Sequence, residues 1–212
     1  MACYIREMTG EDLKDVSEID REAFPTQWPA PNYGNELRNR MAHFIVACDG
    51  DRPLPKPIAE AATSQKQGWL SSLARRLFGR ATLPQRAAVS ASHYIIGFVG
   101  FWIMSDEAHI TSIAVREKYR RHGVGEMLMI SAIENASELK ADILTLEVRV
   151  SNTGAQALYT KYCFKQVGLR KGYYTDNRED AFIMSTDRIA APAFQERFQR
   201  LKQAFAERKV KS

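Results

Sequence analysis

Cysteine is scarce in this chain of 212 residues, which has only three: Cys3, Cys48 and Cys163. An odd number of widely spaced cysteines argues against a disulfide framework, and none of the spacings is that of a zinc site. We therefore expect free, reduced thiols and no bound metal.

Long hydrophobic runs are also missing. No apolar stretch approaches the roughly 18 residues that cross a membrane. Residues 1–7 lead directly into a strand-like pattern, without the architecture of a signal peptide. The sequence shows no internal repeat either. Together these features predict a cytoplasmic, globular protein with one main domain.

Acidic residues are few in two segments. Residues 51–91 contain seven Lys/Arg against two Asp/Glu, a net charge of +5, and residues 189–212 contain six against two, a net charge of +4. Because the whole chain has a net charge of +5, the remainder sums to −4. We predict one domain over residues 1–188 that is interrupted by a basic insertion at 51–91 and followed by a basic helical tail at 189–212.

The insertion begins with three prolines and continues with sequence rich in Ala, Ser and Gln. One helical candidate within it has apolar residues on one side: Trp69, Leu70, Leu73, Leu77 and Phe78. Two interpretations remain open. The segment is a partly flexible excursion whose helix docks on its own domain, or it contacts a partner, RNA or a membrane surface.

Elsewhere, hydrophobic periodicity predicts alternating strands and helices. Strands are expected at 4–8, 43–48, 94–104, 109–115, 143–150, 165–174 and 180–186, and helices at 9–24, 33–41, 124–139, 153–162 and from 192 onward. Asp49-Gly50 should stop the second strand. The result is an α/β fold with a mixed sheet of about seven strands and helices on both faces.

A glycine-containing turn joins a strand to the helix at 124–139. Its sequence is Arg120-Arg121-His122-Gly123-Val124-Gly125. A helix that begins at such a turn presents free backbone N–H groups, which suit a phosphate. The spacing fits neither a P-loop nor a dinucleotide fingerprint. The turn alone therefore indicates either a pyrophosphate site or simply a tight turn before a packed helix.

Residues 93–186 resemble the GNAT acetyltransferase superfamily, and within it the bacterial, RimI-type ribosomal-protein-alanine N-acetyltransferases. The matching motifs are Arg120-x-x-Gly123-x-Gly125, Leu146-Glu147-Val148-Arg149-Val150-Ser151-Asn152, Ala157-Leu158-Tyr159, Gly172-Tyr173-Tyr174 and Arg178-Glu179-Asp180-Ala181. Residues 4–50 match more loosely, and the insertion and tail lie outside the resemblance. It implies a GNAT fold in which the two middle strands splay apart.

The resemblance also implies that acetyl-CoA lies between the strands that end at Val115 and Glu147. It assigns the cofactor to the backbone of Ile113, Ala114 and Val115, to the turn and first helical residues Arg120, Arg121, His122, Gly123, Val124, Gly125 and Glu126, and to Asn152 in the next loop.

Glu147 and Tyr159 are the candidate catalytic residues. An amine must lose a proton before it attacks a thioester, and a carboxylate supplies that function. From the pattern alone, Glu147 is equally well an outward-facing residue paired with Arg149. The resemblance implies that Glu147 is the base and that Tyr159 protonates the departing thiolate. The alternative for Tyr159 is a half-buried aromatic residue with a satisfied hydroxyl.

Aromatic residues are the candidates for acceptor binding: Phe24, Trp28, Tyr173 and Tyr174. They would form walls around the first residues of a peptide, and core packing is the alternative. His109, two residues after Glu107, either relays the amine's proton or is a structural histidine.

One position departs from the family pattern. Cys163 precedes Phe164 where the family usually has glycine. If this position has a positive φ, the cysteine costs about 1–2 kcal/mol, and the turn behind Tyr159 is then expected to be shaped differently.

The predicted function is transfer of an acetyl group to the N-terminal α-amino group of a protein. The acceptor implied by the resemblance is a ribosomal protein with an N-terminal Ala, and the basic segments suggest contact with the ribosome or its RNA. Two alternatives remain: the same chemistry on a lysine side chain or small amine, and an inactive acyl-CoA-binding module.

Overall fold

The computed structural model describes residues 2–26, 31–53 and 93–210. Trp28 and nearly all of the predicted insertion at 51–91 lie outside these residues. Within the described ranges, no helix combines the length and the apolar character needed to cross a bilayer. The three cysteines are free thiols, as predicted.

Seven strands form one mixed sheet in the order β1-β2-β3-β4-β5-β7-β6. The strands are β1 Cys3–Glu7, β2 Ala42–Pro53, β3 His93–Met104, β4 Glu107–Val115, β5 Ile143–Arg149, β6 Lys165–Arg170 and β7 Ala181–Ser185. The helices are α1 Leu13–Ala23, α2 Tyr33–Glu36, α3 Val124–Glu138, α4 Thr153–Lys161 and α5 Pro192–Val210, with short 3₁₀ turns at Gly10–Asp12 and Glu117–Tyr119. Only the β4–β5 pair is parallel; every other neighbouring pair is antiparallel. The predicted mixed sheet of about seven strands is confirmed.

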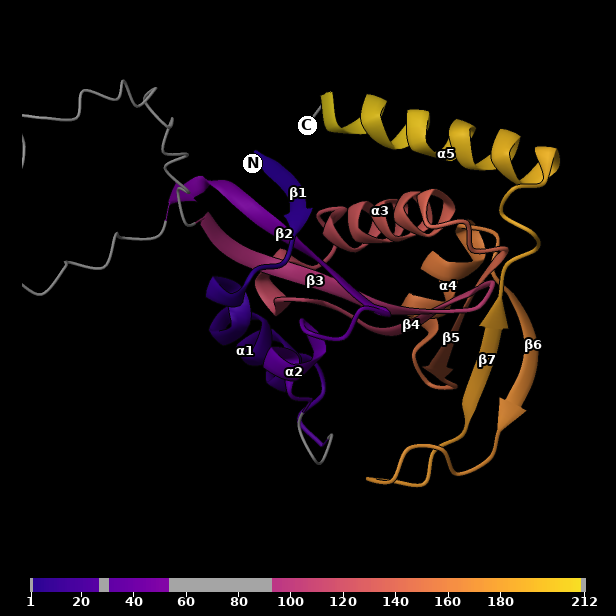
Figure 1. Cartoon of the computed structure of the whole chain (residues 1–212), viewed down its shortest axis with the longest axis horizontal. Coiled ribbons are helices and arrows are strands. Elements are labelled where there is room, and N and C mark those ends of the chain that lie inside the picture. The colour runs from indigo at the N-terminus through magenta and orange to yellow at the C-terminus, as the bar shows by residue number, and fades with distance from the viewer. Residues whose placement is uncertain (1, 27–30, 54–92, 211–212) are drawn as a thin grey trace, which may run out of the picture.

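Helices cover both faces of the sheet, as predicted (Figure 1). On one face, Val16 and Ile19 of α1 and Tyr33 of α2 pack against Phe44 and Phe98 of the sheet. Complete burial of such side chains stabilises the fold by roughly 1.5–3 kcal/mol each. On the other face, α3 and α4 pack on a larger core that includes Leu128, Met129, Ile133, Phe101, Leu146 and Tyr162.

Three predicted boundaries are wrong. The strand predicted over 165–174 ends at Arg170, because the chain turns at Gly172, whose φ of 59° is left-handed, and Tyr173 and Tyr174 lie in the following loop. The strand predicted to stop at Asp49-Gly50 continues to Pro53, because the N–H of Gly50 donates to the carbonyl of Ala2 at 2.6 Å and keeps the chain extended. The helix predicted over 33–41 is a single turn that ends at Glu36. Its first turn is capped by the side chain of Asn32, which accepts from the N–H of Asn35 at 3.1 Å.

The C-terminal helix α5 lies along α3 on the side away from the sheet (Figure 1). Its apolar face is part of the domain, since Phe194 and Phe198 are buried in the larger core and Phe205 packs against it. The ring of Phe198 lies 6.4 Å from that of Tyr162 at the end of α4. The predicted basic tail is therefore a helix that is packed against the core.

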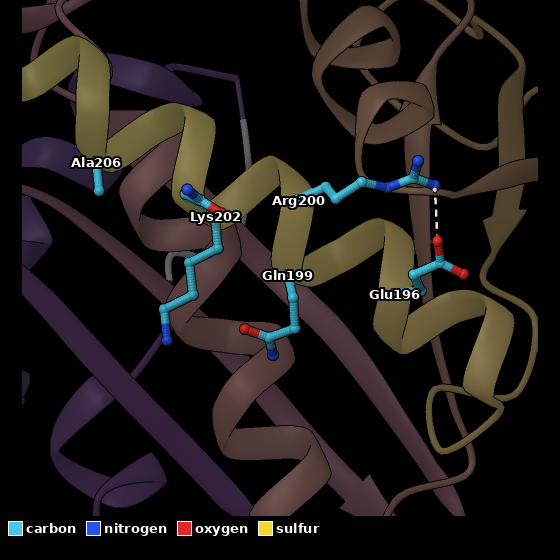
Figure 2. A pocket seen from close by; sticks show the side chains of 6 residues that line it. Glu196, Gln199, Arg200, Lys202 and Ala206 are labelled. Carbon is cyan, nitrogen blue, oxygen red and sulfur yellow. Dashed lines mark ion pairs between the residues drawn. The ribbon is translucent and has the colours of Figure 1, made fainter.

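The opposite face of α5 is polar. Glu196, Gln199, Arg200, Lys202, Gln203 and Ala206 line a hollow of about 460 Å³, part of which is shown in Figure 2. Its basic residues are partly neutralised by the chain itself: Arg200 lies 3.8 Å from Glu196, and Lys202 pairs with Glu134 of α3. None of the residues that line this hollow is a predicted site residue.

Cys163 occupies a left-handed turn at the end of α4, with φ of 72°. The N–H of Cys163 donates to the carbonyl of Thr160 and the N–H of Phe164 to that of Tyr159, both at 3.1 Å. These two bonds are the Schellman arrangement, which normally places glycine at the left-handed residue. The expectation of a differently shaped turn is wrong, because the cysteine adopts the glycine-like conformation.

Candidate active site between strands β4 and β5

Strands β4 and β5 are paired over only part of their length. Residues 107–110 of β4 pair with residues 143–146 of β5, and the ladder ends there. Beyond that point β4 stays paired with β3 as far as Val115, while β5 stays paired with β7 as far as Arg149. The two middle strands therefore separate after Ile110 and Leu146, as predicted for a splayed sheet.

A bulge in β4 accompanies this separation. Gly100 is opposite Ser112 and Phe101 is opposite Ile110, so Thr111 is the extra residue. An extra residue shifts the alternation of side chains between the faces. Consistently, Ile110 belongs to the core on the α3 side and Ala114 to the core on the α1 side. The structure places the predicted segment Ile113–Val115 past the last residue of β4 that pairs with β5.

The glycine turn leads from β4 into α3 as predicted. Gly123 is the N-cap of α3 and has a left-handed φ of 83°, and Arg121 is also left-handed with φ of 66°. Arg120 Nε donates to the carbonyl of Val115 at 3.1 Å, which ties the turn to the end of β4. His122 Nδ1 lies 2.8 Å from the carbonyl of Arg120. The first N–H groups of α3 therefore follow a turn fixed next to the opening between the strands.

Gly123 also contacts α5. A Cβ at this position would lie 3.1 Å from the ring of Phe205, which is closer than a side chain normally packs. At Gly125, by contrast, a Cβ would meet only an ordinary contact at 3.6 Å from Leu158. Glycine at position 123 therefore has both a conformational and a steric cause.

The carboxylate of Glu126 is held by neighbouring helices. It accepts hydrogen bonds from Lys161, from the Tyr162 hydroxyl at 2.7 Å and from Arg208 of α5 at 2.7 Å. Burial raises the pKa of this carboxyl, but the bonds from Lys161 and Tyr162 outweigh it and leave the pKa lowered. The side chain of Glu126, a predicted cofactor residue, is therefore bound to residues at α4 and α5.

Asn152 caps α4. Its side-chain oxygen accepts from the N–H of Ala155 at 3.1 Å, which is the usual role of Asn before a helix. The residue is exposed in the loop that follows β5. Asn152 is therefore held in place by α4 at the carboxyl end of β5.

Glu147 faces a cluster of polar and aromatic side chains. Its neighbours Leu146 and Val148 are buried in the larger core, so Glu147 lies on the opposite face of β5. Glu147 Oε2 lies 3.2 Å from His109 Nε2, and Glu147 Oε1 lies 3.1 Å from a guanidinium nitrogen of Arg170. Its side chain is 9 % exposed. These contacts contradict the alternative in which Glu147 pairs with Arg149, because Arg149 binds other acids.

Arg149 instead organises the loop between β6 and β7. Its guanidinium lies 2.8 Å from Asp176 and 3.0 Å from Glu179, and it stacks 3.8 Å from the centre of the Tyr174 ring. Tyr173 and Tyr174 pack edge to face, with ring centres 5.2 Å apart. Burial raises the pKa of Tyr174 to about 12. The predicted tyrosine pair is therefore held rigidly at the end of β5.

Tyr159 is buried on α4, with 6 % of its surface exposed. Burial raises the pKa of its hydroxyl well above the ordinary value, and the nearby Tyr174 raises it further. Because the pKa is raised, the hydroxyl keeps its proton at neutral pH. Tyr159 thus borders the tyrosine pair from the α4 side of the sheet.

Comparisons with known proteins agree with this geometry. The model of the acetyltransferase (GNAT) family matches residues 56–163, about half of the chain. The chain belongs to the GNAT acetyltransferase family. A provisionally named ribosomal protein bS18-alanine N-acetyltransferase of Bacillus subtilis is 35 % identical over 181 residues, which are 85 % of this chain and 92 % of that protein. An N-alpha-acetyltransferase of Sulfurisphaera tokodaii is 44 % identical over 183 residues, 85 % of this chain and 90 % of the relative.

A solved structure shows the same GNAT fold. The crystal structure of Arabidopsis thaliana NAA60 in complex with acetyl-CoA aligns with a TM-score of 0.64 and 18 % identity, over 88 % of this chain and 98 % of that one. At this identity the likeness shows the fold alone. The predicted GNAT fold and family are thereby confirmed.

The other two predicted acceptor residues are Phe24 and Trp28. Phe24 ends α1 and packs, half-buried, against the smaller core. Two residues later, the Thr26 hydroxyl donates to Asp176 at 2.7 Å, so the loop after α1 reaches the loop that carries the tyrosine pair. Trp28 lies outside the described residues.

Sequence reasoning missed three residues that contact this cluster: Arg170 at Glu147, and Thr145 and Glu107 beside His109. A signal for two of them was present. Glu107 and His109 are two residues apart on one strand, and Thr145 and Glu147 are two apart on the next, so each pair shares a face. Arg170 gave no such signal, because its approach depends on how β6 and β7 pair.

Proposed function

We propose that this GNAT acetyltransferase moves the acetyl group of acetyl-CoA to the α-amino group of a protein N-terminus, and that its acceptor is a ribosomal protein beginning with Ala. The observation that carries the proposal is the placement of Glu147 and His109, 3.2 Å apart, where β4 and β5 begin to separate. The name of the B. subtilis relative supports the choice of acceptor.

The opening and the glycine turn fit acetyl-CoA, which supplies an acyl group activated as a thioester. Ile113–Val115 have no ladder partner on β5, so their backbone groups on that side, apart from the Val115 carbonyl that accepts from Arg120, are available to the pantetheine arm. The amides that follow Gly123 at the start of α3 suit the pyrophosphate. Arg120, Arg121 and His122 add positive charge, and the amide of Asn152 lies at the carboxyl end of β5.

Glu147 acts as the base in this proposal. An α-amino group has a pKa of roughly 7.7–8.0, so much of it arrives protonated at neutral pH. The nearly buried carboxylate accepts that proton, and Arg170 and His109 hold its two oxygens in place. The amine can then attack the thioester carbonyl, with the backbone N–H groups of Ile113–Val115 stabilising the negative oxygen.

Tyr159 acts as the acid. Its hydroxyl is protonated at neutral pH, so the departing sulfur can take its proton, and the second proton that the attacking amine loses then restores the hydroxyl. Tyr173 and Tyr174, together with Phe24, form the wall against which the first residues of the acceptor peptide lie. Tyr173 is 42 % exposed, which leaves aromatic surface for a peptide.

The proposal is tested by Glu147→Gln, with Glu138→Gln on the exposed end of α3 as the matched control. We expect kcat to fall roughly 10²- to 10⁴-fold with the affinity for acetyl-CoA nearly unchanged. The loss should shrink as pH rises above about 8, because the amine then arrives unprotonated. A Glu147→Gln enzyme with full activity would remove this residue from the mechanism.

The acceptor is tested with a peptide panel and an assay of free thiol release. The panel contains peptides that begin with Ala and with other residues, a blocked peptide with one lysine, and a polyamine. The proposal predicts fastest release with the free Ala terminus. Faster release with the lysine peptide or the polyamine would favour the alternative acceptors, and no release with any amine would favour an acyl-CoA-binding module.

We also infer contact with ribosomal RNA through the basic segments 51–91 and 189–212, on the basis of charge placement alone. Deletion of 51–91 should weaken co-sedimentation with ribosomes, and the wild-type interaction should weaken as salt rises. Unchanged co-sedimentation would reject this contact without affecting the assigned chemistry.

A further inference from the structure

A series of side chains in polar contact runs from Glu147 along the paired part of β4 and β5. It consists of Glu147, His109, Thr145 and Glu107 in that order. His109 is directly opposite Thr145 in the parallel register. Because side chains alternate along a strand, Glu107 and Glu147 lie on the same face as this pair. The strand pairing itself therefore aligns the four side chains.

Each neighbouring pair in the chain is in contact. His109 Nε2 lies 3.2 Å from Glu147 Oε2, and His109 Nδ1 lies 2.9 Å from Thr145 Oγ1. The Thr145 hydroxyl in turn donates to Glu107 Oε1. The two ends differ in exposure: the Glu147 side chain is 9 % exposed and the Glu107 side chain 37 %. One end of the chain is thus in the candidate site and the other reaches solvent.

The hydrogen-bond partners of Thr145 also determine which nitrogen of His109 carries its hydrogen. A hydroxyl has one hydrogen, and that of Thr145 is used in the bond to Glu107, so its oxygen must accept from Nδ1–H of His109. With its hydrogen on Nδ1, the neutral ring has a bare Nε2 that faces Glu147 Oε2 at 3.2 Å, so Nε2 can take a proton from the Glu147 carboxyl group.

We propose that Thr145 and Glu107 are positioning residues that form the outlet for the proton released by the reaction. This inference rests on the proposed function. An ammonium group that becomes an amide loses two protons and the departing sulfur takes one, so one proton must leave the site in each turnover. Thr145 and Glu107 provide a path to solvent for that proton through His109.

The transfer conserves protons along the chain. The proton from the amine binds Glu147 and then passes to His109 Nε2, which makes the ring an imidazolium. The imidazolium gives its Nδ1 proton to Thr145 Oγ1 as the hydroxyl proton moves to Glu107, which releases it to water. One proton enters and one leaves, and no other reactant is required. The path resets when the hydroxyl rotates and the ring exchanges protons with water at its exposed edge.

The charged groups nearest His109 come from three neighbouring strands. Glu107 of β4 and Glu147 of β5 flank the ring, with Nδ1 and Nε2 at 3.8 Å and 3.2 Å from their carboxylates. Arg170 of β6 lies beyond Glu147, 3.1 Å from its other oxygen.

Thr145→Val tests the outlet, because it removes the hydroxyl and keeps the shape of the side chain. We expect kcat/KM to fall roughly tenfold below pH 7 and to recover above pH 8, where the amine arrives unprotonated. Glu107→Gln should reproduce this profile, and Thr145→Ser should restore the wild-type profile. The control is Thr111→Val. The Thr111 hydroxyl is also on β4, but it donates to the Gly100 carbonyl and is not one of the side chains between Glu147 and Glu107.

Three outcomes separate the claims. A Thr145→Val profile that superimposes on that of the wild type overturns the outlet, as does a loss that is equal at every pH and is accompanied by a lower melting temperature. If Thr145→Val has no effect while Glu147→Gln is slow, only the outlet fails. If Glu147→Gln is also fully active, the proposed function fails as well.

Discussion

Cys163 has a backbone conformation that is strained for a residue with a side chain. Its φ of 72° is the left-handed conformation that a side chain disfavours by about 1–2 kcal/mol. The turn cannot relax, because the N–H groups of Cys163 and Phe164 both bond to the last turn of α4. That helix carries Tyr159, so the strain borders the candidate site.

We predict that Cys163→Gly unfolds at a higher denaturant concentration than Cys163→Ala, by about 1 kcal/mol in the free energy of unfolding. Both changes remove the thiol, so their difference reports the backbone conformation alone. The measurement is a urea titration of the two variants side by side. Equal stability of the two variants would show that the turn does not hold the left-handed conformation in solution.

Residue identities were predictable from the sequence where a motif names them, but their contacts were not. Glu147, Tyr159 and His109 were all candidates, yet the pairing of Glu147 with His109 and Arg170 depends on which strands lie side by side. β6 and β7 follow β5 in sequence, but β7 lies between β5 and β6 in the sheet. The sequence pattern does not encode that order, so Arg170 could not be assigned to Glu147.

Elements were predictable wherever the hydrophobic period was long and uninterrupted. The α3 helix and strands β3 to β5 begin and end within about two residues of their predicted bounds. The failures occurred where a distant segment fixes the chain: β2 passes Gly50 because Ala2 accepts its N–H. The packing of α5 could not be predicted, because the sequence indicates a basic amphipathic helix but not the surface that its apolar face covers.

At this scale we predict that α5 is required for stability. Phe198→Ala should lower the free energy of unfolding by about 3–5 kcal/mol, since Phe198 is 3 % exposed and packs against Phe194 and Tyr162. Gln199→Ala, on the exposed outer face shown in Figure 2, is the control and should change stability by less than about 0.5 kcal/mol. The measurement is thermal or urea unfolding. A small effect of Phe198→Ala would mean that α5 is only loosely attached.

On the scale of the whole molecule, the splayed sheet needs a connection across its open side. The halves are joined by the parallel ladder at one end, where residues 107–110 meet residues 143–146. A second connection is the bond from the Thr26 hydroxyl, after α1, to Asp176, in the loop that carries Tyr173 and Tyr174. Asp176 is also held by Arg149 at 2.8 Å. This contact bridges the N-terminal half of the sheet to the tyrosine pair.

If the acceptor peptide lies against those tyrosines, loss of the bridge should affect the acceptor and spare the donor. We predict that Thr26→Val raises KM for the peptide roughly three- to tenfold, as expected for one lost hydrogen bond, and leaves KM for acetyl-CoA unchanged. Asp176→Asn tests the same bond from the other side, and the double variant should be no worse than the more affected single variant. Initial rates with each substrate varied in turn separate the two KM values. An equal rise in both KM values would mean that the bridge holds the sheet as a whole and does not specifically position the loop that carries Tyr173 and Tyr174.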